Sequence, residues 1–467
     1  VTPRRQRQMC IRDSCCASSS QQCVCILYSR RTHFSCHSGF HHYWKPKKYS
    51  VVTMETLSIN RERLQADIES LAQIGRQEDY GIYRMAFTPG DMQGREWFKN
   101  KITEAGLELY QDGAANIHAR LGWDDQRPSI LMGSHLDTVP AAGHLDGALG
   151  VLVALECLRC INEEKLKLNY PLEAIAFSDE EGRFGGMLGS QAIAGMLSPE
   201  SILNAVDLDG VKLTDAMDAV DLNAMDALYA KRNPDSIHAY LELHIEQGPL
   251  LDNTGISVGN VDAIAGLFKW EASLIGKANH AGTTPMEMRN DAFMGLSEFS
   301  SQIQRILDEN GSARSVATIG RVEISPGAAN VIPGTVNFSL EARDTDQQVL
   351  EDIGNAFRKA LSAIARRRGL MFEFKVLSEI EAVKSDPGMV RTIENVAKSL
   401  RIPFLQMASG AAHDAQIMGH ITRAGMIFVP SKDGRSHSIA EWTDMDDIEK
   451  GANVALNTLY RIAGGMF

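Results

Sequence analysis

The sequence predicts an α/β protein with a mixed, largely parallel sheet and an inserted unit of ferredoxin-like (βαββαβ) order. Three observations support this fold class. Strand-like apolar runs alternate with helical runs between residues 116 and 244, which is typical of a layered α/β domain. From about Gly259 the order changes to strand, helix, strand, strand, helix, strand. Beyond residue 377 the alternation of helix and strand resumes, so the second unit interrupts the first.

The elements of the first unit follow from hydrophobic periodicity. Helical spacing of apolar residues predicts two N-terminal helices, at 56–76 and Gly94–Ala105. The elements expected next are strands Asn116–Leu121 and Ser129–Ser134, helix Ala148–Asn162, strand Leu172–Ser178, helix Gly189–Ala194 and strand Ala239–His244. Most of these strands are continuous apolar runs, as in a parallel sheet covered on both faces.

The inserted unit and the end of the chain are read in the same way. The inserted unit should contain strand Phe268–Ile275, helix Asp291–Glu309, strands Ser315–Ile324 and Thr335–Glu341, helix Gln347–Arg368 and strand Met371–Val376. Helix Gly388–Leu400, strand Gly425–Val429 and helix Asp447–Ile462 should close the chain. We therefore expect a main domain in two parts, 54–257 and 378–467, around an inserted domain at 258–377.

The first 53 residues differ in composition from the rest. They hold six of the eight cysteines and four of the thirteen histidines, and their net charge is +8. No helical or strand periodicity is visible in them. We expect residues 1–53 to be a non-native or disordered extension, with Met54 as the natural start.

Charge and cysteine content restrict the class of protein. The formal net charge is −12 for the chain and −20 for the part that follows residue 53, which argues against nucleic acid as a partner. No apolar run approaches the ~18–20 residues of a membrane-spanning helix. After Met54 only Cys157 and Cys160 remain; on an apolar helix they are expected in the core, and a reducing, cytoplasmic setting is expected.

The sequence SHLDTVPAAGHLDG at residues 134–147 follows a predicted buried strand and contains His135, Asp137 and Asp146. Imidazole and carboxylate groups at such a loop suit a divalent metal such as zinc. Asp137 could accept a hydrogen bond from the second ring nitrogen of His135 and so orient the ring. A single motif of this kind is more often an ordinary polar turn.

Three further strand ends carry residues of the same chemistry. Glu180 and Glu181 follow the strand at 172–178, His244 and Gln247 follow the strand at 239–244, and His437 follows the strand at 425–429. The carboxyl ends of parallel strands form one edge, which is where open α/β sheets place their functional residues. Metal ligands repeated at four strand ends predict a metal centre.

Five ligands fit two divalent ions better than one tetrahedral zinc. We expect Asp146 to bridge the ions, with His135 and His244 on the first and Glu181 and His437 on the second. Zinc is expected, with manganese, cobalt and nickel as alternatives. Two such ions would lower the pKa of a water towards ~7 and polarise a carbonyl. Glu180 is then the free carboxylate that acts as general base and acid.

Seven motifs in order resemble one enzyme family. They are GSHLDTVP…LDGALGVL, FSDEEGRFGG, LHIEQG, GKANHAGTTPMEMRNDA, EARDTD, SGAAHDA and FVPSKDGRSHS. Together they resemble the zinc-dependent amidohydrolases of the hydantoinase/carbamoylase type, within the superfamily that also holds aminoacylases and di-zinc carboxypeptidases. The resemblance runs from about Leu57 to the carboxyl end and implies the same metal ligands and the same role for Glu180.

The resemblance also implies substrate contacts and an assembly. His280 would stabilise the oxyanion, Asn330 and Arg343 would bind the substrate carboxylate, and Gln247 would line the pocket. The inserted domain would act as a closing lid and as the contact of a homodimer. The sequence departs from the family at three places. Ala142 and Ala412 stand where the family has glycine and concern the substrate more than the metals, and Ile439-Ala440 replaces a common Pro-Glu.

The expected reaction is hydrolysis of the ureido C–N bond of an N-carbamoyl-L-amino acid, so the partner is a small ureido acid. Allantoate amidohydrolase or β-ureidopropionase activity is the alternative within the same chemistry. An aminoacylase or dipeptidase is disfavoured because His244 stands where related peptidases carry Asp. A metal-free binding scaffold would be expected to have lost a metal ligand or the base, yet the five expected ligands and Glu180 are all present.

Overall fold

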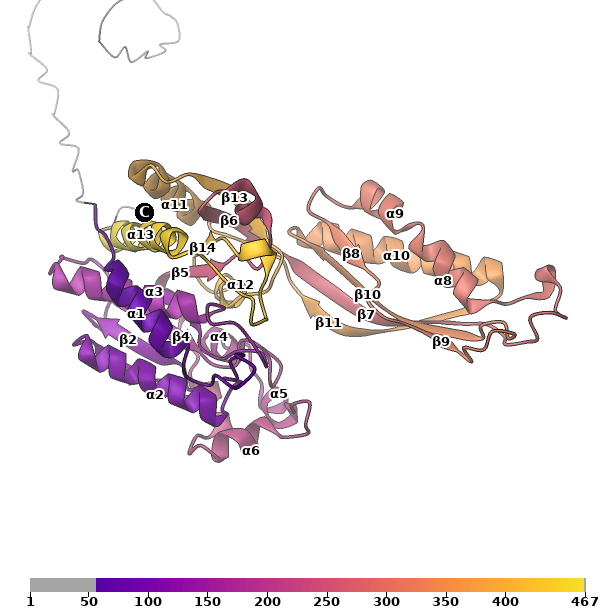
Figure 1. Ribbon diagram of the computed structural model, residues 1–467, viewed down its shortest axis with the longest axis horizontal. Coiled ribbons are helices and arrows are strands. Elements are labelled where there is room, and N and C mark those ends of the chain that lie inside the picture. Colours follow the sequence, from indigo (N-terminus) through magenta and orange to yellow (C-terminus); the bar gives the residue numbers. More distant parts are fainter. Residues whose placement is uncertain (1–55, 466–467) are drawn as a thin grey trace, which may run out of the picture. The chain divides into compact units, whose positions relative to one another are not determined.

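The computed structural model describes residues 56–465, and the expectations for residues 1–53 and for a start at Met54 lie outside the described residues. The described chain belongs to one compact unit, which contains two sheets. The larger sheet has nine strands in the order β1-β2-β4-β3-β5-β14-β6-β12, with β13 also paired to β6. Figure 1 shows the helices that lie along this sheet.

The strands of the larger sheet come from both ends of the described chain. They are β1 (Glu108–Gln111), β2 (Ile117–Leu121), β3 (Ser129–His135), β4 (Leu172–Phe177), β5 (Ile237–Ile245), β6 (Val258–Ile264), β12 (Val383–Lys384), β13 (Phe404–Ser409) and β14 (Ala424–Val429). β3 is parallel to both β4 and β5, and β5 is parallel to β14. β2 and β6 run antiparallel to their inner neighbours. The mixed sheet with a parallel centre confirms the predicted fold class.

Helices cover both faces of this sheet. They are α1 (Arg61–Leu71), α2 (Pro89–Glu104), α3 (Ala148–Glu163), α4 (Leu188–Ala194), α7 (Leu250–Thr254), α11 (Pro387–Leu400), α12 (Asp414–Met418) and α13 (Met445–Ala463). Two short helices, α5 (Pro199–Asn204) and α6 (Leu213–Asp218), pack in a separate apolar cluster. Alternate residues of β3 enter different cores: Ile130 and Met132 pack with α3 and α13, whereas Leu131 packs with residues of α4 and α12. Because side chains alternate across a strand, both faces of the sheet are apolar.

The smaller sheet has five strands and is antiparallel. Its strands are β7 (Gly266–Ile275), β8 (Val316–Thr318), β9 (Val322–Ser325), β10 (Thr335–Asp344) and β11 (Met371–Ile380), in the order β11-β7-β10-β8, with β9 beside β10. The helices α8 (Ala292–Ser300), α9 (Ile303–Asn310) and α10 (Gln347–Arg368) pack on it around Phe299, Phe338 and Phe357. This is the βαββαβ order that the sequence predicts.

Several predicted elements differ in detail. The helix expected at Asp291–Glu309 is divided into α8 and α9, and the Ser301 hydroxyl donates to the Glu298 carbonyl at the break. The strand expected at Ser315–Ile324 is divided into β8 and β9, and Arg321 between them exchanges hydrogen bonds with Ser339 of β10. The first helix begins only at Arg61, since the Asn60 side chain caps it by accepting from the Arg63 N–H.

Residues 258–264, which we expected in the inserted unit, form β6 of the larger sheet instead. β6 pairs with β13 and β14, and β7 of the smaller sheet begins only at Gly266. The hydrophobic pattern also did not indicate β1, β12, β13 or the short helices α5, α6, α7 and α12. Most of these elements are too short to show a clear period of hydrophobic residues, and the apolar run of β13 is interrupted by Gln406.

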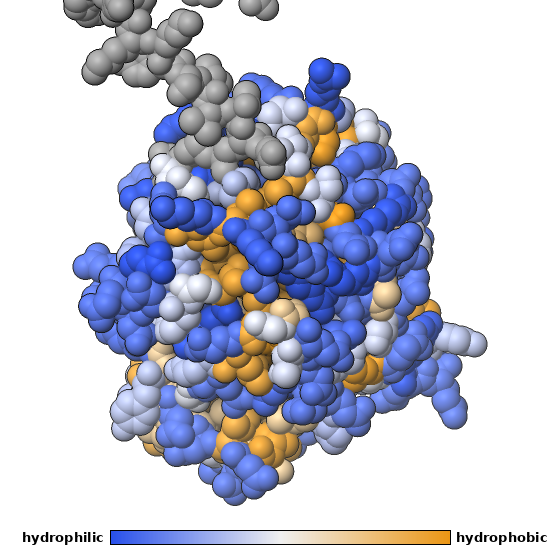
Figure 2. Space-filling model, turned by 90° about the vertical axis from the view of Figure 1, so that its left-hand side faces the viewer, coloured by the Kyte–Doolittle hydropathy of each residue, from blue (hydrophilic) through white to orange (hydrophobic). Residues whose placement is uncertain are grey.

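Two further expectations from the sequence concern membrane-spanning helices and the two cysteines that follow Met54. Figure 2 shows one face of the molecule, where hydrophobic residues form small patches among hydrophilic ones. None of the helices at residues 56–465 is long and apolar enough to cross a membrane. Cys157 and Cys160 on α3 are free and buried, as expected for core residues.

Candidate metal centre

The predicted ligands meet at the carboxyl ends of the four parallel strands. His135 is the last residue of β3, Glu180 and Glu181 follow β4, His244 is near the end of β5, and His437 lies in the loop after β14. Asp146 lies in the loop between β3 and α3. Each of these loops leaves the same edge of the sheet, so the fold brings the side chains together.

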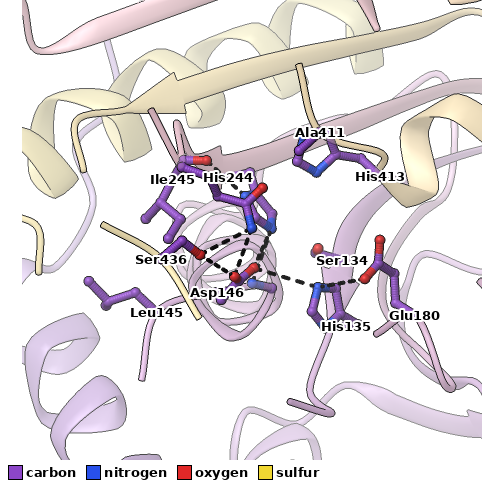
Figure 3. A network of polar contacts seen from close by, with 12 residues as sticks. Ser134, His135, Leu145, Asp146, Glu180, His244, Ile245, Ala411, His413 and Ser436 are labelled. Carbon is purple, nitrogen blue, oxygen red and sulfur yellow. Dashed lines mark hydrogen bonds and ion pairs between the residues drawn. The ribbon is translucent and has the colours of Figure 1, made fainter. Parts of the chain in front are cut away.

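Asp146 lies at the centre of the cluster, and Figure 3 shows His135, His244 and Ser436 around its carboxylate. Oδ1 is 3.1 Å from Nε2 of His244 and 3.9 Å from Nε2 of His135. Oδ2 is 3.1 Å from Nε2 of His437. The side chains of Asp146 and His244 are 3% and 1% exposed, so their contact is shielded from water, whereas the side chain of His437 is 48% exposed.

The ligand atoms form two groups that share Asp146. His135, Asp146 and His244 make one group that could hold a metal ion, and Asp146, Glu181 and His437 make the second. In the second group, Nε2 of His437 is 3.5 Å from Oε2 of Glu181. The division of ligands between the two groups matches the division that the sequence predicts.

A third group, of Glu242, His244 and His413, also has ligand atoms close together. Its carboxylate is already engaged, because Glu242 accepts hydrogen bonds from the Ser134 hydroxyl at 2.8 Å and the Ala415 N–H at 2.8 Å. The Tyr240 hydroxyl donates to it as well, at 3.1 Å. Glu242 therefore supports the floor of the site and is poorly placed to be a metal ligand.

Glu180 lies beside the first group of ligands. Its Oε2 is 3.4 Å from Nε2 of His135, and its side chain is 10% exposed. Burial and the neighbouring carboxylates of Asp414 and Glu181 raise the pKa of Glu180 well above its usual range. A buried carboxylate with a raised pKa is suited to both taking up and releasing a proton.

Asp137 makes a different contact from the one expected. The ring Nδ1 of His135 faces the backbone carbonyl of Asp137 at 3.0 Å, whereas the Asp137 carboxylate is 3.9 Å away. That carboxylate instead accepts from the backbone N–H groups of Glu180 and Glu181, at 3.3 and 3.1 Å. Asp137 thus orients His135 through its backbone and the Glu180–Glu181 turn through its side chain.

The charges in the site suit cations. Burial and the neighbouring Asp146 raise the pKa of Glu181 to about 8. Burial opposes ionisation of Asp146, but His244 and His437 hold the pKa of Asp146 well below its usual range. Oε1 of Glu181 and Oε1 of Gln247 are buried without a hydrogen-bond partner among the described residues. Carboxylates crowded around unpartnered oxygens fit divalent ions, which would offset the repulsion and occupy the free lone pairs.

The backbone at the site is constrained. Gly147 has φ +62°, and a Cβ there would lie 2.3 Å from ring atoms of His135, so this position requires glycine. Gln247 and His437 also have positive φ angles, of 57° and 53°. Such conformations in residues other than glycine are concentrated at functional sites.

Of the four predicted substrate contacts, Gln247 touches a candidate ligand, and Arg343 reaches a loop near the centre. Gln247 Nε2 donates to Asp146 Oδ2 at 2.8 Å. Arg343 of β10 donates from Nη1 to the Gly410 carbonyl at 2.6 Å, on the loop that leads to His413. His280 and Asn330 lie beside each other on the smaller sheet's loops, where the Ala281 N–H donates to the Asn330 carbonyl at 2.9 Å. No hydrogen bond or ion pair links those two side chains to the metal ligands within residues 56–465.

Three residues in the site were missed by the sequence analysis. The ring of His413 packs edge-on against His244, with centroids 4.6 Å apart, and its Nε2 is 2.8 Å from the Ser409 hydroxyl. Ser436 donates to Asp146 Oδ2 at 2.6 Å, and buried Glu441 accepts from the Asp146 N–H at 3.1 Å. Two signals for these residues were present in the sequence: Ser436 and Glu441 lie close to His437, and His413 lies in the SGAAHDA motif.

The fold and this site define a class: a metal-dependent hydrolase, with a buried carboxylate beside its candidate metal ligands. Residues 131–461 match the peptidase family M20/M25/M40, and the chain belongs to this family. Within the family it is an amidohydrolase of the hydantoinase/carbamoylase type.

Comparisons with known proteins support this assignment over nearly the whole described chain. An N-carbamoyl-L-amino acid amidohydrolase of Geobacillus stearothermophilus is 37% identical, with 87% of this chain and 100% of the relative covered. An allantoate amidohydrolase of Escherichia coli is 32% identical, with 86% and 98% covered. The crystal structure of a hydantoinase/carbamoylase family amidase from Burkholderia ambifaria matches with a TM-score of 0.79 and 33% identity, covering 88% of this chain and 99% of that one.

Proposed function

We propose that this enzyme hydrolyses the ureido C–N bond of an N-carbamoyl-L-amino acid with the help of two divalent ions. One water is consumed, and the C–N bond to the amino acid breaks. The products are the free amino acid and carbamate, which decomposes to carbon dioxide and ammonia. The substrate is then a small ureido acid with a carboxylate at one end and a neutral carbamoyl group at the other.

The observation that carries this proposal is the position of Asp146 between two groups of ligands. Oδ1 faces His244 and Oδ2 faces His437, each at 3.1 Å, as a carboxylate shared by two ions would. The relative from Geobacillus stearothermophilus, named an N-carbamoyl-L-amino acid amidohydrolase, is covered along its whole length and supports the substrate class.

The site residues would divide the work between holding ions and moving a proton. His135 and His244 would hold one ion, Glu181 and His437 the other, and Asp146 both; zinc suits these nitrogen and oxygen ligands, with manganese, cobalt and nickel as alternatives. The ions would lower the pKa of a water and polarise the substrate carbonyl. Glu180 would take the proton from the water and give it to the leaving nitrogen of the amino acid.

Residues of the smaller sheet would bind the rest of the substrate. Arg343 would bind its carboxylate, because a guanidinium donates to two carboxylate oxygens at once. Asn330 would join Arg343, His280 would donate to the oxyanion, and Gln247 would line the pocket from the larger sheet. For His280 and Asn330 this requires either closure of the smaller sheet as a lid or their supply by a second subunit.

A homodimer is therefore part of the proposal. β9 pairs with β10 alone within the described chain, and its Val322 and Ile324 are 43% and 41% exposed. A strand at the edge of a sheet, with exposed apolar side chains, is suited to contact between subunits. We also propose a cytoplasmic location, which the free thiols of Cys157 and Cys160 support.

Allantoate is the second candidate substrate. The allantoate amidohydrolase of Escherichia coli is 32% identical and is covered along 98% of its length, so sequence similarity separates the two activities only slightly. Both substrates carry a carboxylate and a ureido group, and the same residues would serve either.

One experiment tests the substrate class. Purified enzyme loaded with zinc or manganese is assayed for ammonia release from a series of N-carbamoyl-L-amino acids, β-ureidopropionate and allantoate. Primary-amine release is measured in parallel with N-acetyl-amino acids and dipeptides. The proposal predicts the highest kcat/KM for an N-carbamoyl-L-amino acid. A clear preference for allantoate would establish the second candidate, and activity confined to N-acetyl substrates or dipeptides would overturn both.

A further inference from the structure

Glu441 connects the two loops that supply ligands to both proposed ions. It lies on the loop after β14, which also carries His437, and its side chain reaches the loop before α3, which carries Asp146. Its Oε1 accepts hydrogen bonds from the Leu145 N–H at 2.7 Å and the Asp146 N–H at 3.1 Å. The residue is only 3% exposed.

A second route joins Glu441 to the shared carboxylate. The Ser436 hydroxyl donates to Oδ2 of Asp146 at 2.6 Å and lies 3.5 Å from Oε2 of Glu441. The Glu441 carboxylate thus accepts from the backbone N–H of Asp146, and Ser436 lies between the side chains of the two residues. The carboxylate is not near enough to the other ligand atoms to belong to either group that could hold an ion.

The loop before α3 also packs directly on the Glu441 side chain. A Cβ at Gly143 would lie 2.4 Å from both Cβ and Oε1 of Glu441. Gly143 has no positive φ angle, so a larger residue is excluded there by contact rather than by backbone conformation. The close approach allows the two backbone N–H groups to reach one oxygen.

We propose that Glu441 is a positioning residue: it holds the Asp146 loop against the His437 loop in the geometry that binds the two ions. This inference rests on the proposed two-ion site and adds a residue to it. Groups that orient metal ligands commonly contribute 10–100-fold to metal affinity or activity. Because Asp146 would be a ligand of both ions, displacement of its loop should weaken the binding of both ions.

A substitution at this position should leave the fold intact. Glu441 lines a cavity of about 410 Å³ between α1 and α13, together with Ile68, Leu145 and Met445. Removal of its carboxylate would enlarge an existing space, and water could reach the N–H groups of Leu145 and Asp146. Removal of the Glu441 carboxylate should therefore weaken metal binding more than it lowers the stability of the protein.

The experiment compares Glu441→Ala, Glu441→Gln and Gly143→Ala with the wild type. Zinc or manganese binding to the apo enzymes is measured by competition with a chelator of known affinity, and unfolding of the apo proteins by denaturant. We expect Glu441→Ala and Gly143→Ala to weaken binding about 10–100-fold. Glu441→Ala should have similar apo stability, whereas Gly143→Ala should also lower the apo stability, because its added Cβ would overlap with Glu441. Glu441→Gln should restore binding to within a few-fold, since an amide oxygen can accept the same two N–H groups.

The matched control is Asp386→Ala. Asp386 also accepts from two backbone N–H groups, those of Gly388 and Met389, but at the start of α11 and away from the ligand loops. It should affect stability without affecting metal affinity. Wild-type affinity in Glu441→Ala, or failure of Glu441→Gln to restore binding, would overturn the positioning role. If the wild-type enzyme itself bound fewer than two ions, the proposed two-ion function would fail instead.

Discussion

His244 Nε2 lies 3.1 Å from Asp146 Oδ1, although the two residues belong to different strand–loop segments of the chain. Although burial opposes it, this contact raises the pKa of His244 to about 9 in the protein without ions. A divalent ion between the two groups would replace the shared proton, since a histidine must be neutral to act as a ligand. The pair marks where the first proposed ion would bind.

Metal removal should abolish activity, and its restoration should need two ions per subunit. The two ligand groups around Asp146 are the reason. We expect elemental analysis to find two ions per subunit, and zinc, manganese, cobalt or nickel to restore activity to the apo enzyme. A single tightly held ion that remains after His437→Ala and Glu181→Ala would contradict the paired site.

Glu180→Gln and Glu181→Gln should have different effects although the residues are adjacent. Glu180→Gln should retain both ions and lower kcat by ~10²–10⁴, the usual contribution of general acid–base catalysis. Glu181→Gln should lose an ion, because it removes a charged ligand from the group with His437. Metal content and kcat are measured on both variants, and an active Glu180→Gln enzyme would exclude Glu180 from proton transfer.

Arg343→Lys should mainly raise KM, by about tenfold or more, because a lysine ammonium cannot replace the bidentate contact of a guanidinium with a carboxylate. Steady-state kinetics with the best substrate of the ammonia-release series provide the measurement. Arg321→Lys is the control, since Arg321 lies near the same sheet and its side chain is 53% exposed. An unchanged KM in Arg343→Lys would place the substrate carboxylate elsewhere.

Glu173→Gln should lower stability at neutral pH. Glu173 of β4 is fully buried beside His118 Nδ1 at 3.0 Å and Arg232 Nη1 at 2.6 Å. Burial opposes its ionisation, but His118 and Arg232 lower its pKa below the ordinary value. Its contribution is therefore complete above the unfolded pKa of ~4.3 and declines as the pH falls through the lower folded value.

We expect a loss of ~3–5 kcal/mol for this variant at pH 7, since one partner of a buried charge cluster is removed. The difference from the wild type should narrow below about pH 4. Denaturant unfolding at a series of pH values measures it, with the exposed Glu323→Gln as control. A difference that stayed constant down to pH 2 would show that the charge of Glu173 is not the cause.

The parallel centre of the larger sheet could be predicted because β3, β4, β5 and β14 are each marked by an apolar run in the local sequence. Continuous apolar runs such as those at 129–134 and 424–429 are buried on both faces, and the polar residues that follow them must leave the sheet at its edge. β6 could not be assigned in the same way. Its residues 258–264 join the larger sheet through pairing with β13, which comes more than a hundred residues later.

In the candidate site, too, some features could be predicted from the local sequence and others depend on the tertiary structure. The sequence by itself determined which residue types follow each strand, so His135, Asp146, Glu180, Glu181, His244 and His437 could be named as ligands or base. Only the tertiary structure decided that the two oxygens of Asp146 face different histidines, that the Asp137 carboxylate holds the Glu180–Glu181 turn, and that Glu441 reaches the Asp146 loop. The physical reason is that hydrogen bonds between distant loops depend on backbone turns and side-chain directions, which no local pattern of residues specifies.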